Sequence, residues 1–223
     1  MTAKIGAITI GQSPRVDVLP DIMDILGEVE IVERGALDGL NFEDIQKFAP
    51  SDGDYVLVTR LKDGRSVQIA EKHILERMQL QINELASQGV DGILLLCTGE
   101  FPGFTCHKPL LYPQRLLQHF VAGAALDQTV GVLTPDARQV PQAARRWLEN
   151  GQKTVFVEPA NPYGNHEQIV KAGMALKQQG AKLLVMDCIG YTRKMKAAVA
   201  EATGLPVVLP RTVAARAVAE LFG

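Results

Sequence analysis

Gly92-Ile93-Leu94-Leu95-Leu96-Cys97-Thr98-Gly99-Glu100 is a short apolar run that ends in a polar, turn-forming cluster. Such a run is typical of a strand buried inside a parallel sheet. In open α/β sheets, ligands bind just beyond the carboxyl ends of the strands. The sequence therefore predicts that Cys97 lies at a ligand-binding edge, with Thr98 and Gly99 in the turn.

A second stretch repeats this design. Lys182-Leu183-Leu184-Val185-Met186-Asp187-Cys188-Ile189-Gly190-Tyr191-Thr192 again ends an apolar run in Cys-x-Gly, 91 positions after the first cysteine. Residues 5–9 (Ile-Gly-Ala-Ile-Thr) likewise resemble residues 130–134 (Val-Gly-Val-Leu-Thr), at an offset of 125. The offsets differ by 34 residues, about the length of segment 35–69. We infer two related α/β lobes that face each other across a cleft, the first with an inserted helix and hairpin.

Hydrophobic periodicity predicts an alternation of strands and helices along the chain. Strands are expected at 4–10, 29–32, 55–59, 66–69, 92–96, 129–133, 153–157, 182–187 and 207–209. Helices are expected at 17–27, 41–48, 71–88, 114–125, 137–149, 166–179, 192–203 and 212–222. Asp63-Gly64 between two β-type runs is a strong hairpin signal. The pattern predicts a doubly wound, parallel α/β architecture.

Composition excludes several classes of protein. The 223 residues are 47% hydrophobic and 22% charged, with a formal net charge of −2, so there is no general attraction to nucleic acid or anionic membrane. No apolar run reaches the roughly 18 residues of a membrane span, and no signal peptide is recognisable, so a cytoplasmic protein is expected. Three cysteines do not suggest a disulfide framework. A metal site from Cys97, Cys106, His107 and Cys188 would match no zinc spacing, so none is expected.

The loop Thr9-Ile10-Gly11-Gln12-Ser13-Pro14-Arg15, with Asp17 and Pro20, resembles the opening of the AroM family. The segments 96–101 and 187–192 fit that family too, so the resemblance covers essentially the whole chain. The family name suggests an association with the shikimate pathway, and the family has no settled activity.

The two-cysteine layout is more distantly similar to the aspartate/glutamate racemase superfamily, which includes hydantoin racemase and maleate isomerase. That resemblance implies two pseudo-symmetric α/β lobes with the site between them, no cofactor, and a homodimer. It also implies that segment 206–223 returns to the first lobe. The lobes would then be 1–112 with 206–223, and 113–205.

The sequence departs from amino-acid racemases at the motifs themselves. Those enzymes usually have Asn-Thr after the first cysteine and Thr after the second, whereas here Thr98-Gly99 and Ile189-Gly190 follow. The first strand also ends without the Asp-Ser pair of glutamate racemases. Amino acids are therefore not the expected substrates.

Cys97 and Cys188 are the candidate catalytic residues. A thiolate on one side of a cleft and a thiol on the other could remove and return a proton next to a carboxylate, or either could act as a nucleophile. Backbone N–H groups, hydroxyls and one guanidinium would bind the substrate anion. The expected substrate-binding residues are Gln12, Ser13, Arg15, Thr98, Gly99, Thr134, Ile189, Gly190, Tyr191 and Thr192.

Three functions remain open at this point. The first is a cofactor-independent racemase or isomerase of a small carboxylic acid. The second is a non-catalytic or regulatory protein that binds a small anion, and the third is a lyase or decarboxylase on the same scaffold. A plainer interpretation is that each cysteine is a small buried hydrophobe and that residues 11–15 form only a strand-to-helix turn.

Overall fold

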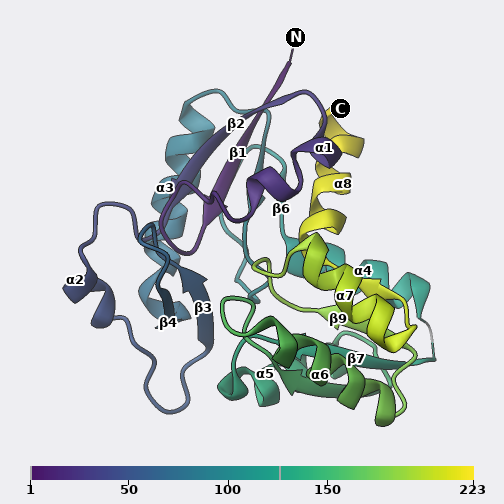
Figure 1. Ribbon diagram of the computed structural model, residues 1–223. Coiled ribbons are helices and arrows are strands. Elements are labelled where there is room, and N and C mark those ends of the chain that lie inside the picture. The colour runs from purple at the N-terminus through teal and green to yellow at the C-terminus, as the bar shows by residue number, and fades with distance from the viewer. Residues whose placement is uncertain (1, 126) are drawn as a thin grey trace. The chain divides into compact units, whose positions relative to one another are not determined.

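A computed structural model describes residues 2–125 and 127–223. The chain divides into two compact units, Met1–Pro113 with Ala214–Gly223, and Gln114–Val213. Each unit contains its own four-stranded parallel sheet, so the predicted α/β architecture is confirmed (Figure 1). Within the described residues, no helix is both long and apolar enough to cross a membrane.

The sheet of the first unit has the strand order β2-β1-β5-β6. Its strands are β1 (Ala3–Thr9), β2 (Val29–Gly35), β5 (Gly92–Leu95) and β6 (Leu110–Leu111). β1 lies between β2 and β5 and pairs in parallel with both. The carboxyl ends of β1 and β5 therefore meet at one edge. β6 was not predicted, because two residues carry too little periodicity to be recognised.

Helix α3 (Leu75–Ser87) covers the sheet of the first unit. A 3₁₀ turn (Glu71–His73) precedes it, and Gly89 follows with a positive φ of 75°. Met78, Ile82 and Leu85 are fully buried on its apolar face. This confirms the predicted amphipathic helix, whose burial is the main source of its stability.

The prediction of one continuous helix over 17–27 is wrong. The chain forms a 3₁₀ turn at Leu19–Asp21 and a four-residue helix, α1 (Met23–Leu26). Pro20 has no N–H to donate to the preceding turn, and Ile22 lies outside helical geometry, with φ −130° and ψ 0°. The helical spacing of apolar residues here reflects burial rather than one regular helix.

The segment between β2 and α3 holds the predicted insert. Asn41 caps the short helix α2 (Phe42–Gln46), accepting a hydrogen bond from the Asp44 N–H at 2.9 Å. β3 (Val56–Arg60) and β4 (Ser66–Ala70) form a separate antiparallel hairpin. Gly64 in its turn has a φ of 87°, which favours glycine. The predicted hairpin is confirmed (Figure 1).

The sheet of the second unit has the order β10-β9-β7-β8. Read from the other end, β8, β7, β9 and β10 correspond to β2, β1, β5 and β6 of the first sheet. Its strands are β7 (Thr129–Thr134), β8 (Thr154–Pro159), β9 (Leu183–Met186) and β10 (Val207–Val208). The later helices are α4 (Pro113–Ala124), α5 (Val140–Glu149), α6 (His166–Gln178), α7 (Arg193–Thr203) and α8 (Pro210–Phe222).

Alternate residues of β9 enter different cores of the second unit. Leu184 and Met186 belong to the cluster that contains residues of α6 and α7. Leu183 and Val185 belong to the cluster that contains residues of α4 and Trp147 of α5. Because strand side chains alternate between faces, the sheet is covered on both sides.

The two sheets repeat each other in detail. The Leu96 N–H donates to the Ile8 carbonyl at 2.7 Å, and the Asp187 N–H donates to the Leu133 carbonyl at 2.8 Å. On the other side of the same central strands, Ala36 and Ala160 donate to the carbonyls of Thr9 and Thr134, at 2.9 and 2.7 Å. Thr9 and Thr134 are the last residues of the two segments whose similarity suggested the repeat. The pseudo-symmetry is therefore confirmed at the level of individual hydrogen bonds.

Candidate functional site

Cys97 lies immediately beyond the carboxyl end of β5 in the first unit. Its side chain is 8% exposed and contacts the apolar core. The Gly99 N–H donates to Cys97 Sγ at 3.3 Å. Such donation favours a thiolate over a thiol, because the hydrogen bond is stronger to a charged sulfur.

Cys188 has the same arrangement beyond β9 in the second unit. It is 7% exposed, and the Gly190 N–H donates to Cys188 Sγ at 3.4 Å. Each cysteine also directly follows the residue that bonds to the central strand, Leu96 in one sheet and Asp187 in the other. The two thiols thus occupy equivalent positions in the two sheets.

Glycine packs closely against neighbouring side chains two residues after each cysteine. A Cβ atom on Gly99 would lie 2.7 Å from Leu57 Cδ2, and one on Gly190 would lie 2.7 Å from Tyr163 Cζ. A side chain at either position would therefore displace either its packing partner or the turn. Tyr163, in the loop after β8, was missed in the sequence because nothing local marks it as a neighbour of Gly190.

Arg211, at the start of α8, was also missed. Its side chain is fully buried, and Nε and Nη2 donate to the Ile189 carbonyl at 3.0 and 2.6 Å. A buried arginine is costly unless it is well bonded. The Pro210-Arg211 pair opens a helix in the sequence, but no sequence signal shows that the guanidinium turns back toward residue 189.

Tyr191 anchors the same turn to the end of β8. Its hydroxyl donates to the Ala160 carbonyl, and its side chain is fully buried. Burial raises the pKa of Tyr191 well above its ordinary value, and Cys188 and Asp187 raise it further. The hydroxyl therefore stays protonated and acts as a donor. Thr192 ends the turn by capping α7, accepting from the Met195 N–H at 3.2 Å.

Asp187 anchors the strand end directly before Cys188. Its Oδ2 accepts from Arg146 and, at 2.8 Å, from Trp147 Nε1, all three side chains being buried. Both donors belong to α5, so this network connects the helix to the end of β9. Trp147 is thus a fully buried core residue that also has a polar partner.

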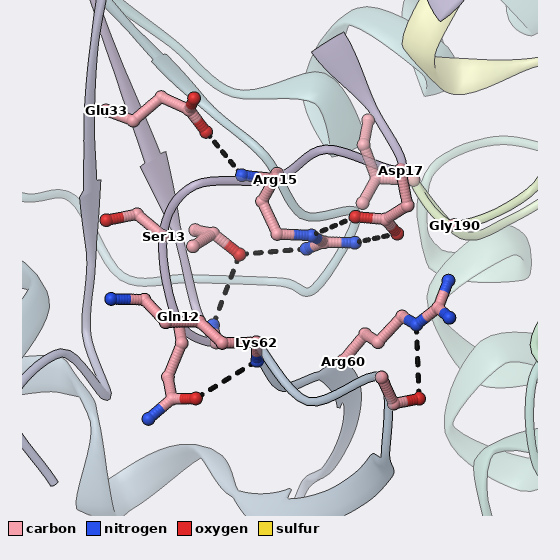
Figure 2. A network of polar contacts seen from close by, with 12 residues as sticks. Gln12, Ser13, Arg15, Asp17, Glu33, Arg60, Lys62 and Gly190 are labelled. Atoms are coloured by element: carbon pink, nitrogen blue, oxygen red, sulfur yellow. Dashed lines mark hydrogen bonds and ion pairs between the residues drawn. The ribbon is translucent and has the colours of Figure 1, made fainter. Parts of the chain in front are cut away.

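The loop after β1 is held by its own polar network (Figure 2). Arg15 is 2% exposed, and its guanidinium donates to both carboxylate oxygens of Asp17 at 2.8 Å and to Thr9 Oγ1 at 2.9 Å. The Ser13 backbone N–H donates to Asp38 at 2.8 Å, and its hydroxyl donates to the same carboxylate. In this structure both predicted substrate ligands already have protein partners.

Three further predicted residues have clear positions. Gln12 bridges two segments, since its amide donates to the Leu40 carbonyl at 3.1 Å and accepts from the Lys62 N–H at 3.1 Å. Thr98 is buried in the turn after Cys97. Thr134, at the end of β7, contacts Gln139 at 3.2 Å.

The predicted site residues form two groups. The first unit brings the loop 12–15 and the turn 97–99 to the adjacent ends of β1 and β5. The second unit brings Thr134 and the turn 188–192 to the adjacent ends of β7 and β9. That both groups share one cleft stays a prediction.

Comparison with known proteins identifies the family and the fold. The sequence profile of the family described as "AroM protein" matches residues 5–222. No curated protein has a sequence that matches this chain. Among solved structures, unliganded arylmalonate decarboxylase has a TM-score of 0.66 at 13% identity, covering 100% of this chain and 93% of its own.

Two racemases also have similar structures. Allantoin racemase from Klebsiella pneumoniae has a TM-score of 0.66 at 18% identity, covering 99% of this chain and 87% of its own. Glutamate racemase from Aquifex pyrophilus has a TM-score of 0.60 at 16% identity, covering 99% and 84%. At such identities the likeness shows the fold, which is that of the aspartate/glutamate racemases.

Proposed function

The chain belongs to the AroM family, and we propose that it is a cofactor-independent racemase or isomerase of a small carboxylic acid, with Cys97 and Cys188 as its acid and base. The observation that carries this proposal is the equivalence of the two thiols. Each follows the corresponding strand of its sheet, and each accepts a hydrogen bond from the glycine two residues later. Cys106 Sγ also accepts from the N–H two residues later, that of Lys108, at 3.4 Å, so the support comes from the matching positions of Cys97 and Cys188 at the ends of corresponding strands.

The proposed chemistry is a proton exchange that requires both thiols to reach one substrate. The thiolate of one cysteine takes the proton from the carbon next to the carboxylate, and the electron pair delocalises into an enolate. The thiol of the other cysteine then delivers its proton to the opposite face of that carbon. The product has the inverted configuration, and the two sulfurs have exchanged protonation states. Backbone N–H groups and hydroxyls of the two turns would bind the enolate oxygens.

The similar solved structures are compatible with this class of substrate. The names of two of them contain arylmalonate and glutamate, which are small carboxylic acids. The likeness to a decarboxylase supports a second candidate on the same residues. There, loss of carbon dioxide would replace the first proton transfer, and one thiol would protonate the resulting carbanion. Release of carbon dioxide distinguishes this reaction from isomerisation.

A binding protein without catalysis is the third candidate, and the first loop favours it. Arg15 is paired with Asp17, and Ser13 is bonded to Asp38, so neither is held ready solely for a substrate. In that case a ligand would stabilise the protein against heat but would not be converted.

The test is exchange of the substrate proton with solvent. The protein is incubated in deuterium oxide with a panel of small mono- and dicarboxylates, and proton NMR follows loss of the signal next to the carboxylate. We expect exchange for at least one acid, with C97A and C188A each lowering the rate by about 10²-fold or more. Interconversion of the two enantiomers that survives in both single variants would exclude the two-thiol mechanism.

Cys106 provides a matched control. It is a half-buried free cysteine of the first unit, outside both strand-end turns. C106A should keep the full exchange rate. If an acid raises the melting temperature of the wild-type protein but no proton exchanges and no carbon dioxide is released, the binding function is correct instead.

A further inference from the structure

The hairpin inserted between β2 and α3 lies against the turn that follows Cys97. Tyr55, directly before β3, accepts a hydrogen bond from the Glu100 N–H through its hydroxyl at 3.2 Å. Leu57 of β3 is 2% exposed, and its Cδ2 atom would lie 2.7 Å from a Cβ atom on Gly99. Because strand residues two positions apart point to the same face, one face of the hairpin covers residues 99 and 100.

The hairpin also contacts the loop after β1. A Cβ atom on Gly11 would collide with Thr59 Oγ1 and would lie 2.8 Å from the Arg60 carbonyl oxygen. Gln12 of this loop accepts from the Lys62 backbone N–H, in the turn of the hairpin, at 3.1 Å (Figure 2). The insert therefore contacts both segments of the first unit that the sequence assigns to the site, and the proposed function gives it no role.

The second unit has an equivalent contact from the corresponding segment. β8 pairs with β7 as β2 pairs with β1, so the loop after β8 corresponds to the insert after β2. From that loop, Pro162 Cγ and Tyr163 Cζ would lie 3.1 and 2.7 Å from a Cβ atom on Gly190. In the first unit, Leu57 makes the same kind of contact with Gly99. Its repetition by two segments of unlike sequence indicates that covering this glycine matters to the turn.

The covered glycine is the residue that bonds to the sulfur. The Gly99 N–H donates to Cys97 Sγ at 3.3 Å, which favours a thiolate. Tyr55 holds the next N–H, that of Glu100, so the hairpin restrains Gly99 at its Cα atom and at the peptide that follows. Glu71 lies close enough to Glu100 for their charges to interact. Negative charge beside the turn disfavours a thiolate, so the N–H donor has to be well placed.

We propose that the inserted hairpin belongs to the reaction site, with Tyr55 and Leu57 as positioning residues for Cys97. Both act through the turn, and neither needs to touch the substrate. That Cys97 reacts with a substrate rests on the proposed function, whereas the effect on the thiol itself is independent of it. Loss of either contact frees the turn, weakens donation to the sulfur and lowers the thiolate fraction at pH 7.

The experiment measures the reactivity of Cys97 in the full chain with Cys106 and Cys188 replaced by serine. Mass spectrometry follows alkylation by iodoacetamide at several pH values. Y55F removes one hydroxyl and should slow alkylation at pH 7 by about three- to tenfold, the effect of one neutral hydrogen bond. The midpoint of the rate against pH should rise. L57A should act in the same direction, and L57M, which restores most of the volume, should bring the rate back toward that of the starting protein.

Y112F is the matched control. Tyr112 of the same unit also accepts a backbone N–H through its hydroxyl, that of Phe104 at 2.9 Å, so the variant removes an equivalent bond elsewhere. Its rate and pH midpoint should equal those of the starting protein. The proposal is overturned if Y55F and Y112F alter the midpoint equally, or if folded Y55F and L57A both leave it unchanged. Y55F, which keeps the ring, decides alone should L57A not fold.

These outcomes are independent of turnover. A raised midpoint in Y55F supports the positioning role even if the wild-type protein exchanges no substrate proton, in which case only the proposed function fails. An unchanged midpoint, in a protein that does exchange the proton, overturns the positioning role and leaves the proposed function intact.

Discussion

The guanidinium of Arg211 and the sulfur of Cys188 are connected through one peptide unit. Arg211 donates to the Ile189 carbonyl at 3.0 and 2.6 Å, and the N–H of the same peptide, that of Gly190, donates to Cys188 Sγ at 3.4 Å. In a trans peptide the carbonyl and the N–H point in opposite directions. A buried positive charge at the carbonyl end polarises the peptide and strengthens its N–H as a donor.

We therefore predict that Arg211 keeps Cys188 reactive. In a protein whose other two cysteines are replaced by serine, R211M should slow alkylation of Cys188 by iodoacetamide at pH 7 by about tenfold, equivalent to about one pH unit in thiol ionisation. The midpoint of the alkylation rate against pH should move upward. The rate measured by mass spectrometry at several pH values checks both effects.

Two further variants separate this role from simple loss of structure. R211K keeps the charge but not the paired hydrogen bonds, so its reactivity should fall between the wild type and R211M. R216M removes an exposed arginine of the same helix and should leave the rate unchanged. An unaltered pH midpoint in folded R211M would show that the guanidinium only packs.

Gly190 and Tyr163 should be energetically coupled. A Cβ on Gly190 would lie 2.7 Å from Tyr163 Cζ and also close to the Tyr163 hydroxyl, so G190A must displace the ring or the turn. We expect G190A to lower the free energy of unfolding by about 1–3 kcal/mol. In the Y163A background the same substitution should cost clearly less, because the obstacle is gone. Urea denaturation of the four proteins in this double-mutant cycle measures the coupling.

Gly103 is the matched control for this cycle. No atom lies within 4 Å of a Cβ built there, and its φ is not positive. G103A should therefore leave stability nearly unchanged in both backgrounds. Equal costs of G190A with and without the Tyr163 ring would contradict the packing argument.

The sequence predicted those features that depend on neighbouring residues. The runs at 92–96 and 182–187 are buried strands because they are short, apolar and followed by turns. Asn41 caps its helix and Asp63-Gly64 forms its hairpin, since both signals act over a few positions. The positions of Cys97 and Cys188 at the ends of their strands followed from the same reasoning.

Two of the features that were missed depend on residues far apart in the chain. Arg211 bonds to a carbonyl 22 positions earlier, and Trp147 bonds to Asp187, 40 positions later. Neither contact leaves a periodic or local pattern. Arg15 was identified as an anion ligand from its residue type, and only the fold shows that Asp17 turns back to pair with it.

The last prediction concerns two carboxylates that Tyr55 brings together beside the turn after Cys97. The Glu71 N–H donates to the Tyr55 carbonyl at 3.0 Å, and the Glu100 N–H donates to the Tyr55 hydroxyl at 3.2 Å. Burial raises the pKa of Glu71 above its ordinary value, and the negative charge of Glu100 raises it further. Because the folded state binds this proton more tightly than the unfolded chain, stability falls as pH rises through that interval.

We predict that E71Q stabilises the protein at pH 7, since it removes a charge that folding partly desolvates. Glu71 is half-buried and solvent screens the repulsion, so the gain should be below about 1 kcal/mol. The gain should vanish near pH 3, where Glu71 is protonated in both states. Urea denaturation at the two pH values measures it. E76Q, which changes an exposed glutamate of α3, should have little effect at either pH, and E100Q should reduce the benefit of E71Q. A gain of equal size at both pH values would show that it does not arise from the charge.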